Sequence, residues 1–90
     1  MAEFLVELYI SREDGVGVGG SSEIARLAAD ELTREGTPVR YLNSIYVPEE
    51  EICFFLYEAV SADAVREAAQ RAALPFERVS EAVAHSKGGK

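Results

Sequence analysis

Glu7 is the residue whose type and position most clearly suggest chemistry. It stands in an otherwise apolar stretch, residues 4–10, between Leu5 and Tyr9 on one side of an expected strand. A carboxylate on an apolar surface that becomes covered has to be paired, protonated or bound to a ligand, because an isolated buried charge is unstable. Glu7 is therefore our candidate for a catalytic acid or base and for a metal ligand.

Cys53 and His85 supply the other donor atoms that transition metals favour. Cys53 is the only cysteine, and it lies beside Phe54 and Phe55. These apolar neighbours disfavour the thiolate, so we predict a buried thiol that reacts slowly, with a ligand role as the alternative. His85 is the only histidine and begins a polar tail. We expect it in solvent, and the alternative is a metal ligand at a seam between two copies.

A glycine-rich segment, residues 15–20, contains the letters of a dinucleotide-binding fingerprint. In that fingerprint the first glycine follows a strand directly, whereas residues 11–14 intervene here. The chain is also too short for a doubly wound sheet. We therefore interpret the segment as a flexible crossover loop, with a weak anion site formed by its amides as the alternative.

The elements that must position these residues follow from hydrophobic periodicity. Residues 3–10, 39–47, 51–58 and 76–83 are short and rich in branched and aromatic side chains, which predicts four strands. Residues 22–35 and the segment after Ser61 repeat apolar residues at helical spacing, which predicts two helices. The resulting order is that of the ferredoxin-like α+β fold, a βαββαβ unit with a four-stranded antiparallel sheet and two helices on one face. We expect a single domain over residues 1–84 and a disordered tail over residues 85–90.

The sheet face that the helices leave uncovered is expected to be apolar and aromatic. With the first and third strands in the centre, the face would show Leu5, Glu7, Tyr9, Cys53, Phe55 and Tyr57. A surface of this kind usually binds a partner, and self-association is the simplest cover for so small a chain. We therefore predict a homodimer.

Composition excludes several classes of partner. Sixteen acidic and nine basic residues give a net charge of -7, which repels nucleic-acid phosphates and anionic membrane surfaces. No apolar run approaches the roughly 20 residues of a membrane span, and the first ten residues do not resemble a signal peptide. We expect a cytoplasmic protein that binds neither nucleic acid nor a membrane.

Five stretches together resemble a family of small bacterial ferredoxin-like domains of mostly unknown function, one branch of which is described as nickel-binding. They are Phe4-Leu5-Val6-Glu7, Tyr41-Leu42-Asn43-Ser44, Tyr57-Glu58-Ala59 in the strand of Cys53, Ala64-Val65-Arg66-Glu67-Ala68-Ala69, and the ending from Leu74 to Val83. The resemblance implies the same fold, makes nickel the cofactor to consider, and assigns Glu7 and Cys53 to the open face. Together with His85 they are our candidate metal ligands. The family often has Trp-Val-His-Ser in the second strand, so Asn43 stands where its histidine is expected. Because asparagine is a poorer nickel ligand than imidazole, we predict weak or absent nickel binding.

Two main functions fit these residues. The first is a small ligand- or metal-binding domain that acts through the open sheet face of a homodimer. Its ligand-binding residues would be Tyr9, Tyr41, Asn43, Cys53, Phe55 and Tyr57 beside Glu7. The alternative is a dimeric α+β barrel-type enzyme, such as a cyclase, isomerase or monooxygenase. In it a small aromatic or polyketide-like substrate would sit between the sheet and the helices, with Glu7 as acid or base. A purely structural interaction protein ranks third. No pair of a base and its orienting residue is visible in the sequence, so binding ranks first and catalysis stays open.

Overall fold

The computed structural model describes residues 1–83, apart from the side chains of residues 14–16 and 18. The predicted tail at residues 85–90, and with it His85, lies outside the described residues. No helix in the described part is long and apolar enough to cross a membrane.

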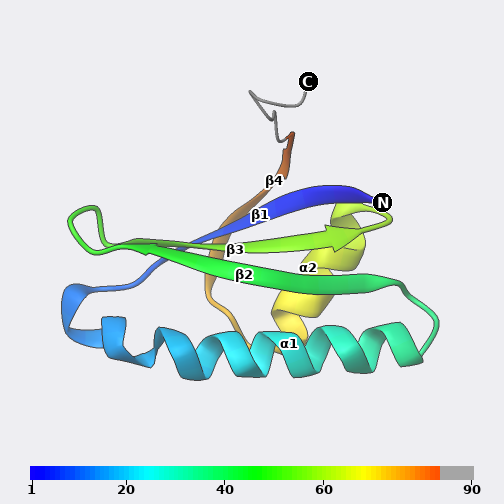
Figure 1. Ribbon diagram of the computed structural model, residues 1–90, viewed down its shortest axis with the longest axis horizontal. Helices are drawn as coiled ribbons and strands as arrows, with labels where there is room; N and C mark the ends of the chain where they lie inside the picture. Colours follow the sequence, from blue (N-terminus) through cyan, green and yellow to red (C-terminus); the bar gives the residue numbers. More distant parts are fainter. Residues whose placement is uncertain (84–90) are drawn as a thin grey trace, which may run out of the picture.

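Four strands and two α-helices follow one another in the predicted order (Figure 1). They are β1 (Ala2–Tyr9), α1 (Val18–Arg34), β2 (Val39–Val47), β3 (Ile52–Ala59), α2 (Ala62–Arg71) and β4 (Phe76–Ala82), with a 3-10 helix, η1 (Arg12–Gly17), between β1 and α1. The strands form one antiparallel sheet in the order β2-β3-β1-β4. Both helices lie on the same side of it (Figure 1). The ferredoxin-like α+β fold is thereby confirmed.

The pairing of β1 with β3 decides which side chains face the helices. Val6 pairs with Phe55 and Leu8 pairs with Cys53, and directly paired residues share a face of the sheet. Cys53, Phe55 and Tyr57 therefore lie on the helix side, where each is 0% exposed. The prediction that these three residues lie on the open face is wrong. Both faces of β3 are apolar, so the alternation that normally separates a core face from a solvent face is missing there.

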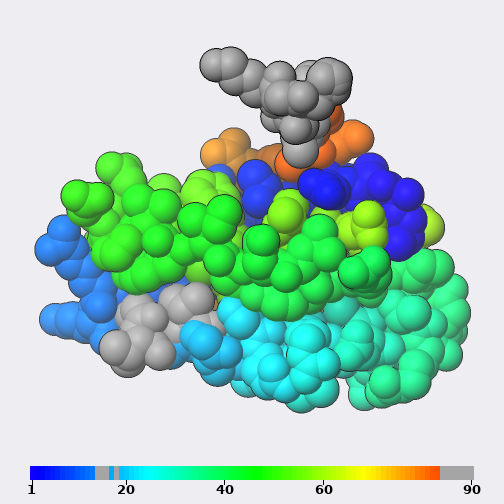
Figure 2. All heavy atoms as spheres, in the orientation of Figure 1, coloured from blue at the N-terminus to red at the C-terminus, as the bar shows by residue number. Residues whose placement is uncertain are grey.

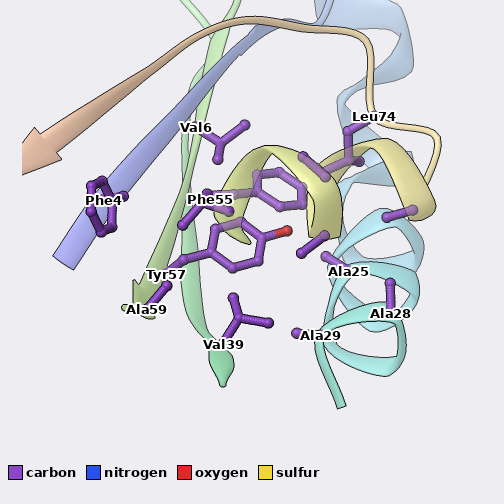
Figure 3. Packing of buried hydrophobic residues seen from close by; sticks show 14 of the residues in the cluster. Phe4, Val6, Ala25, Ala28, Ala29, Val39, Phe55, Tyr57, Ala59 and Leu74 are labelled. Atoms are coloured by element: carbon purple, nitrogen blue, oxygen red, sulfur yellow. The ribbon is translucent and has the colours of Figure 1, made fainter. Parts of the chain in front are cut away.

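The core combines large side chains from the strands with small ones from the helices. Figure 3 shows the rings of Phe55 and Tyr57 standing between the strands and the helices, with Ala25 of α1 close by. The buried helix positions are mostly alanines, namely Ala25, Ala28, Ala29, Ala64, Ala68 and Ala69. Small helix residues allow both helices to lie close to the aromatic rings. Figure 2 shows the side chains of β2 directly above those of α1 along one side of the molecule.

α1 begins earlier than the sequence predicts, at Val18 instead of near Ser22. The segment predicted as a flexible glycine loop is therefore helical, first as η1 and then as the first turn of α1. A Cβ atom added at Gly19 or Gly20 would meet no atom within 4 Å. No neighbouring group of the described chain therefore requires glycine at these two positions.

Candidate functional site

The face of the sheet opposite the helices, called the open face below, is the candidate site. Strand register places on it Glu3, Leu5, Glu7 and Tyr9 of β1, Arg40, Asn43, Ile45 and Val47 of β2, Ile52, Phe54, Leu56 and Glu58 of β3, and Arg78, Ser80 and Ala82 of β4. Within residues 1–83, neither α-helix lies on this side (Figure 1). The open face is therefore a sheet surface without a covering layer from the described chain.

The centre of the open face is apolar. Leu5 and Phe54 lie in the two central strands and are half-buried, as is Leu56. Ile45, on the neighbouring edge strand, is 54% exposed. Contiguous apolar surfaces of this kind on small soluble proteins commonly mark interaction sites.

Glu7 lies on the open face, paired with an arginine. Arg78 Nε donates a hydrogen bond of 3.1 Å to Glu7 Oε1, and the two residues are direct cross-strand neighbours in β1 and β4. The side chains are 24% exposed for Glu7 and 68% exposed for Arg78. The carboxylate that the sequence singled out is thus neutralised by a salt bridge. It also lies on the opposite side of the sheet from the helices, so it cannot act in a pocket between sheet and helices as the enzyme hypothesis required.

A second ion pair lies at the opposite corner of the open face. Arg40 Nη1 is 3.4 Å from Glu58 Oε1, between β2 and β3. The Arg40–Glu58 pair lies on β2 and β3, at one side of the sheet, and the Glu7–Arg78 pair lies on β1 and β4, at the other. Glu58 pairs with Glu3 of β1, four residues before Glu7, so the two ion pairs also lie near opposite ends of the strands. They are therefore placed diagonally across the apolar centre. Each pair contains one acid and one base, so much of the charge on the open face is balanced although the chain carries a net charge of -7.

Among the predicted ligand-binding residues, Tyr9 and Asn43 lie on the open face. Asn43 is exposed and pairs with Leu56 of β3, so β3 separates it from Glu7 of β1. Tyr9 is 60% exposed, and its hydroxyl donates a hydrogen bond of 2.7 Å to Glu51 Oε1. This hydrogen bond and the charge of Glu51 raise the pKa of Tyr9.

Tyr41 lies on the helix side, in contrast to the prediction that it lines the open site. Its ring is 5.9 Å from those of Phe55 and Tyr57, measured between centroids. Its hydroxyl is hydrogen-bonded to Ser44, whose hydroxyl lies 2.6 Å from that of Ser22 in α1. Tyr41 therefore belongs to the polar edge of the core.

Tyr57 and Cys53 are buried in the core. The hydroxyl of Tyr57 has no hydrogen-bond partner among the described residues, and burial raises its pKa, with a smaller effect from Tyr41. Burial also raises the pKa of the Cys53 thiol. Neither side chain is available to a ligand on the open face.

A metal centre built from the predicted ligands does not form within one copy. In the part of the chain that the structure describes, no three His, Cys, Asp or Glu side chains come together. Glu7 and Cys53 lie on opposite faces of the sheet, so they cannot bind the same ion. The donor set expected for nickel is therefore not assembled by the described residues of a single chain.

Sequence reasoning missed Glu51, which was not among the candidate site residues. Its carboxylate accepts hydrogen bonds from the Tyr9 hydroxyl and, at 2.9 Å, from the backbone N–H of Arg12. These contacts, the Arg12 N–H above all, lower the pKa of Glu51. Its backbone oxygen also accepts a 2.9 Å hydrogen bond from the N–H of Ile10. Glu51 thus ties the end of β1 to the turn between β2 and β3, a long-range contact with no local sequence signal.

A family model described as "Nickel responsive protein SCO4226-like" matches residues 10–82. The chain belongs to the SCO4226-like family. The resemblance to a small bacterial family with a link to nickel is thereby confirmed. The crystal structure of SCO4226 from Streptomyces coelicolor A3(2) matches with a TM-score of 0.74 and 15% sequence identity, over 94% of this chain and all of that chain. At this identity the structural match supports the fold alone. A search of the curated proteins finds no match.

Proposed function

We propose that this protein is a homodimer in which the open faces of two copies pack against each other, and that it binds a small ligand or metal ion at the seam. The observation that carries the proposal is the apolar centre formed by Leu5, Ile45, Phe54 and Leu56, on a face that no described helix covers. Burying such a surface against a second copy is favourable, because apolar area is removed from water.

The charges on the open face support a second copy as the partner. In a two-fold symmetric contact the same surface meets itself, so an unbalanced charge would be repelled by its own copy. The Arg78–Glu7 and Arg40–Glu58 pairs each offer one acid and one base to the facing copy. Glu3 is a further acid that strand register places on this face, so three acids and two bases leave the face with a net charge of -1 out of the chain's -7.

The size of the face sets the expected strength of the dimer. Four strands at about 4.8 Å spacing, each about eight residues long at about 3.3 Å per residue, give a face of roughly 500 Å² in projection. Two copies then bury on the order of 1,000 Å², which is the lower end of specific interfaces. We therefore expect a dimer that dissociates in the micromolar range.

The dimer is tested by sedimentation velocity with a matched pair of variants. Ile45 and Leu27 are both large apolar residues, 54% and 53% exposed, but Ile45 lies on the open face and Leu27 on α1. Ile45→Lys places a charge on an edge strand of the apolar centre and should give a monomer, whereas Leu27→Lys should leave the dimer intact. A wild type that stays monomeric at 100 μM, about a hundredfold above a micromolar dissociation constant, contradicts the proposal. So does loss of the dimer in Leu27→Lys alone.

The ligand is tested separately, beginning with nickel because of the family. At the seam, two facing copies would offer the carboxylate of Glu7, the amide of Asn43 and the phenol of Tyr9 twice each. Glu7 is already held by Arg78, so we expect weak nickel binding at most. Calorimetric titration of Ni²⁺ into the wild type and into Glu7→Gln tests this expectation. Saturable, stoichiometric binding that is lost in Glu7→Gln would make nickel the ligand after all.

If nickel does not bind, a thermal-shift screen of small aromatic acids against the same two proteins tests Glu7 as part of a small-molecule site.

A further inference from the structure

A cavity of about 450 Å³ opens on the helix side of the sheet, away from the open face. It lies between the end of β1, the first turns of α1 and the turn from α2 to β4. Its apolar walls include Leu8, Ile10, Ile24, Leu74 and Pro75. The volume falls in the range of about 300–1,000 Å³ that small-molecule sites occupy.

The polar groups around this cavity are few and uncharged. The residues that line it include Ser11, Ser21 and Tyr9, whose hydroxyl donates to Glu51, and no charged residue is among its described lining. Among the described lining residues, an anion would find no lysine or arginine to pair with, and a cation would find no carboxylate. The cavity therefore suits an uncharged ligand that is mainly apolar and carries one hydrogen-bonding group.

The walls of the cavity are held in place by hydrogen bonds from outside it. The hydroxyl of Tyr46 donates to the backbone oxygens of Ile10 and Ser11, at 3.0 Å each. On the opposite wall, the N–H of Leu74 donates to the Ala69 oxygen at 3.0 Å. A site whose walls are already fixed loses little conformational entropy when a ligand enters.

Ile24 is an exposed aliphatic residue at this site. It is 53% exposed although it lines the cavity, so it presents its side chain to both the cavity and solvent. A second, smaller hollow of about 210 Å³ beside Arg71 is lined by both Ile24 and Leu27, whereas Leu27, with the same exposure, does not line the larger cavity. Leu27→Lys therefore perturbs the smaller hollow alone and Ile24→Lys perturbs both, so binding that responds only to Ile24→Lys takes place in the larger cavity.

We propose that this cavity is a binding site for a small, uncharged ring compound that carries a hydroxyl group. The ring occupies the apolar space between Leu8, Ile24 and Leu74, and its hydroxyl reaches the Ser21 side chain. The apolar centre of the open face lies on the other side of the sheet, and Tyr9 at the end of β1 is shared between the open face and the lining of the cavity.

The proposal is tested with 2-naphthol and 2-naphthoate, which share a ring system but differ in charge at pH 7. The chain contains no tryptophan, so the fluorescence of the naphthyl ring can be followed without that background. We expect saturable one-to-one binding of 2-naphthol, with a dissociation constant on the order of 100 μM, a strength typical of ligands of this size. The naphthoate should bind at least tenfold more weakly.

Three variants locate the binding. Ile24→Lys should weaken 2-naphthol binding about tenfold, because it removes an apolar wall and adds a charge. Leu27→Lys should change it less than twofold, and Ser21→Ala should weaken it a few-fold through loss of one hydrogen bond. Circular dichroism checks that all three variants fold. Absence of saturable binding, equal affinity for the naphthoate, or greater sensitivity to Leu27→Lys than to Ile24→Lys would overturn the proposal.

Discussion

The hydroxyl of Tyr57 is buried without a hydrogen-bond partner among the described residues, so Tyr57→Phe is expected to stabilise the protein. A buried polar group that lacks a partner costs about 1–3 kcal/mol in desolvation. The variant keeps the ring and its edge-to-face contact with Tyr41, at 5.9 Å between centroids. The void left by one oxygen, roughly 10 Å³, costs only about 0.2 kcal/mol at about 24 cal/mol per Å³. The net gain in the free energy of unfolding should be about 1 kcal/mol or more.

Urea denaturation followed by circular dichroism measures this change. The slope of the free energy of unfolding against urea concentration is expected to be unaltered. Tyr41→Phe is the matched control. The hydroxyl of Tyr41 is bonded to Ser44, so its removal should lower the free energy of unfolding by about 0.5–1.5 kcal/mol. If Tyr57→Phe destabilises the protein as much as Tyr41→Phe, the hydroxyl of Tyr57 has a partner and the reasoning is refuted.

Tyr57 should also make the stability of the folded protein depend on pH in the alkaline range. Burial raises the pKa of Tyr57 in the folded state above the ordinary value of 10.0. Above pH 10 the unfolded chain therefore releases this proton while the folded chain retains it, and the stability falls by about 1.4 kcal/mol per pH unit for this group. The full stability is present below pH 10. Denaturation at several pH values between 9 and 11 should show a shallower decline in Tyr57→Phe than in the wild type.

Three further outcomes are expected. Gly20→Ala should raise the free energy of unfolding by up to about 1 kcal/mol in urea denaturation, because the added methyl group meets open space in a helix; a loss of stability would show that the glycine is needed. Cys53 should react slowly with a thiol reagent in the native state and rapidly after unfolding, because it is fully buried; equal rates would contradict its burial. Glu51→Gln should flatten the decline of stability in acid, because the pKa of Glu51 is lowered in the folded state. The stability that Glu51 contributes is present above about pH 4.5 and is lost as the pH falls through its lower folded pKa. An unchanged acid profile would exclude Glu51 as a stabilising contact.

The order of strands and helices could be predicted from the sequence because most elements have a clear period. The buried residues of β1, namely Phe4, Val6 and Leu8, alternate with half-exposed ones, and Ser61 caps α2 by accepting a hydrogen bond from the Ala64 N–H. The start of α1 was missed because it has no such cap: Gly17 stands at that position without a side-chain hydrogen bond. The serines at 21 and 22 were the nearest capping residues in the sequence, and they indicated a later start.

The candidate site could be predicted only in part, because its geometry depends on strand register. Glu7 was placed correctly on the open face, since β1 has one clearly apolar side. The two sides of β3 are equally apolar, so the choice between Phe54 and Phe55 for the open face required the pairing with β1. The Glu7–Arg78 salt bridge joins residues 71 positions apart. The salt bridge forms because of the register between β1 and β4, which no local sequence pattern predicts.

The central claim, that two open faces pack together, is tested most directly by the solvent accessibility of isoleucine methyl groups in solution. Ile45 and Ile24 are 54% and 53% exposed in the single chain, on the open face and on α1 respectively. A soluble paramagnetic probe should therefore broaden their methyl NMR signals equally in a monomer. With the protein well above its dissociation constant, we expect the Ile45 methyl groups to be protected and those of Ile24 to remain accessible. Equal broadening at both positions, or protection of Ile24 alone, would contradict the proposed dimer.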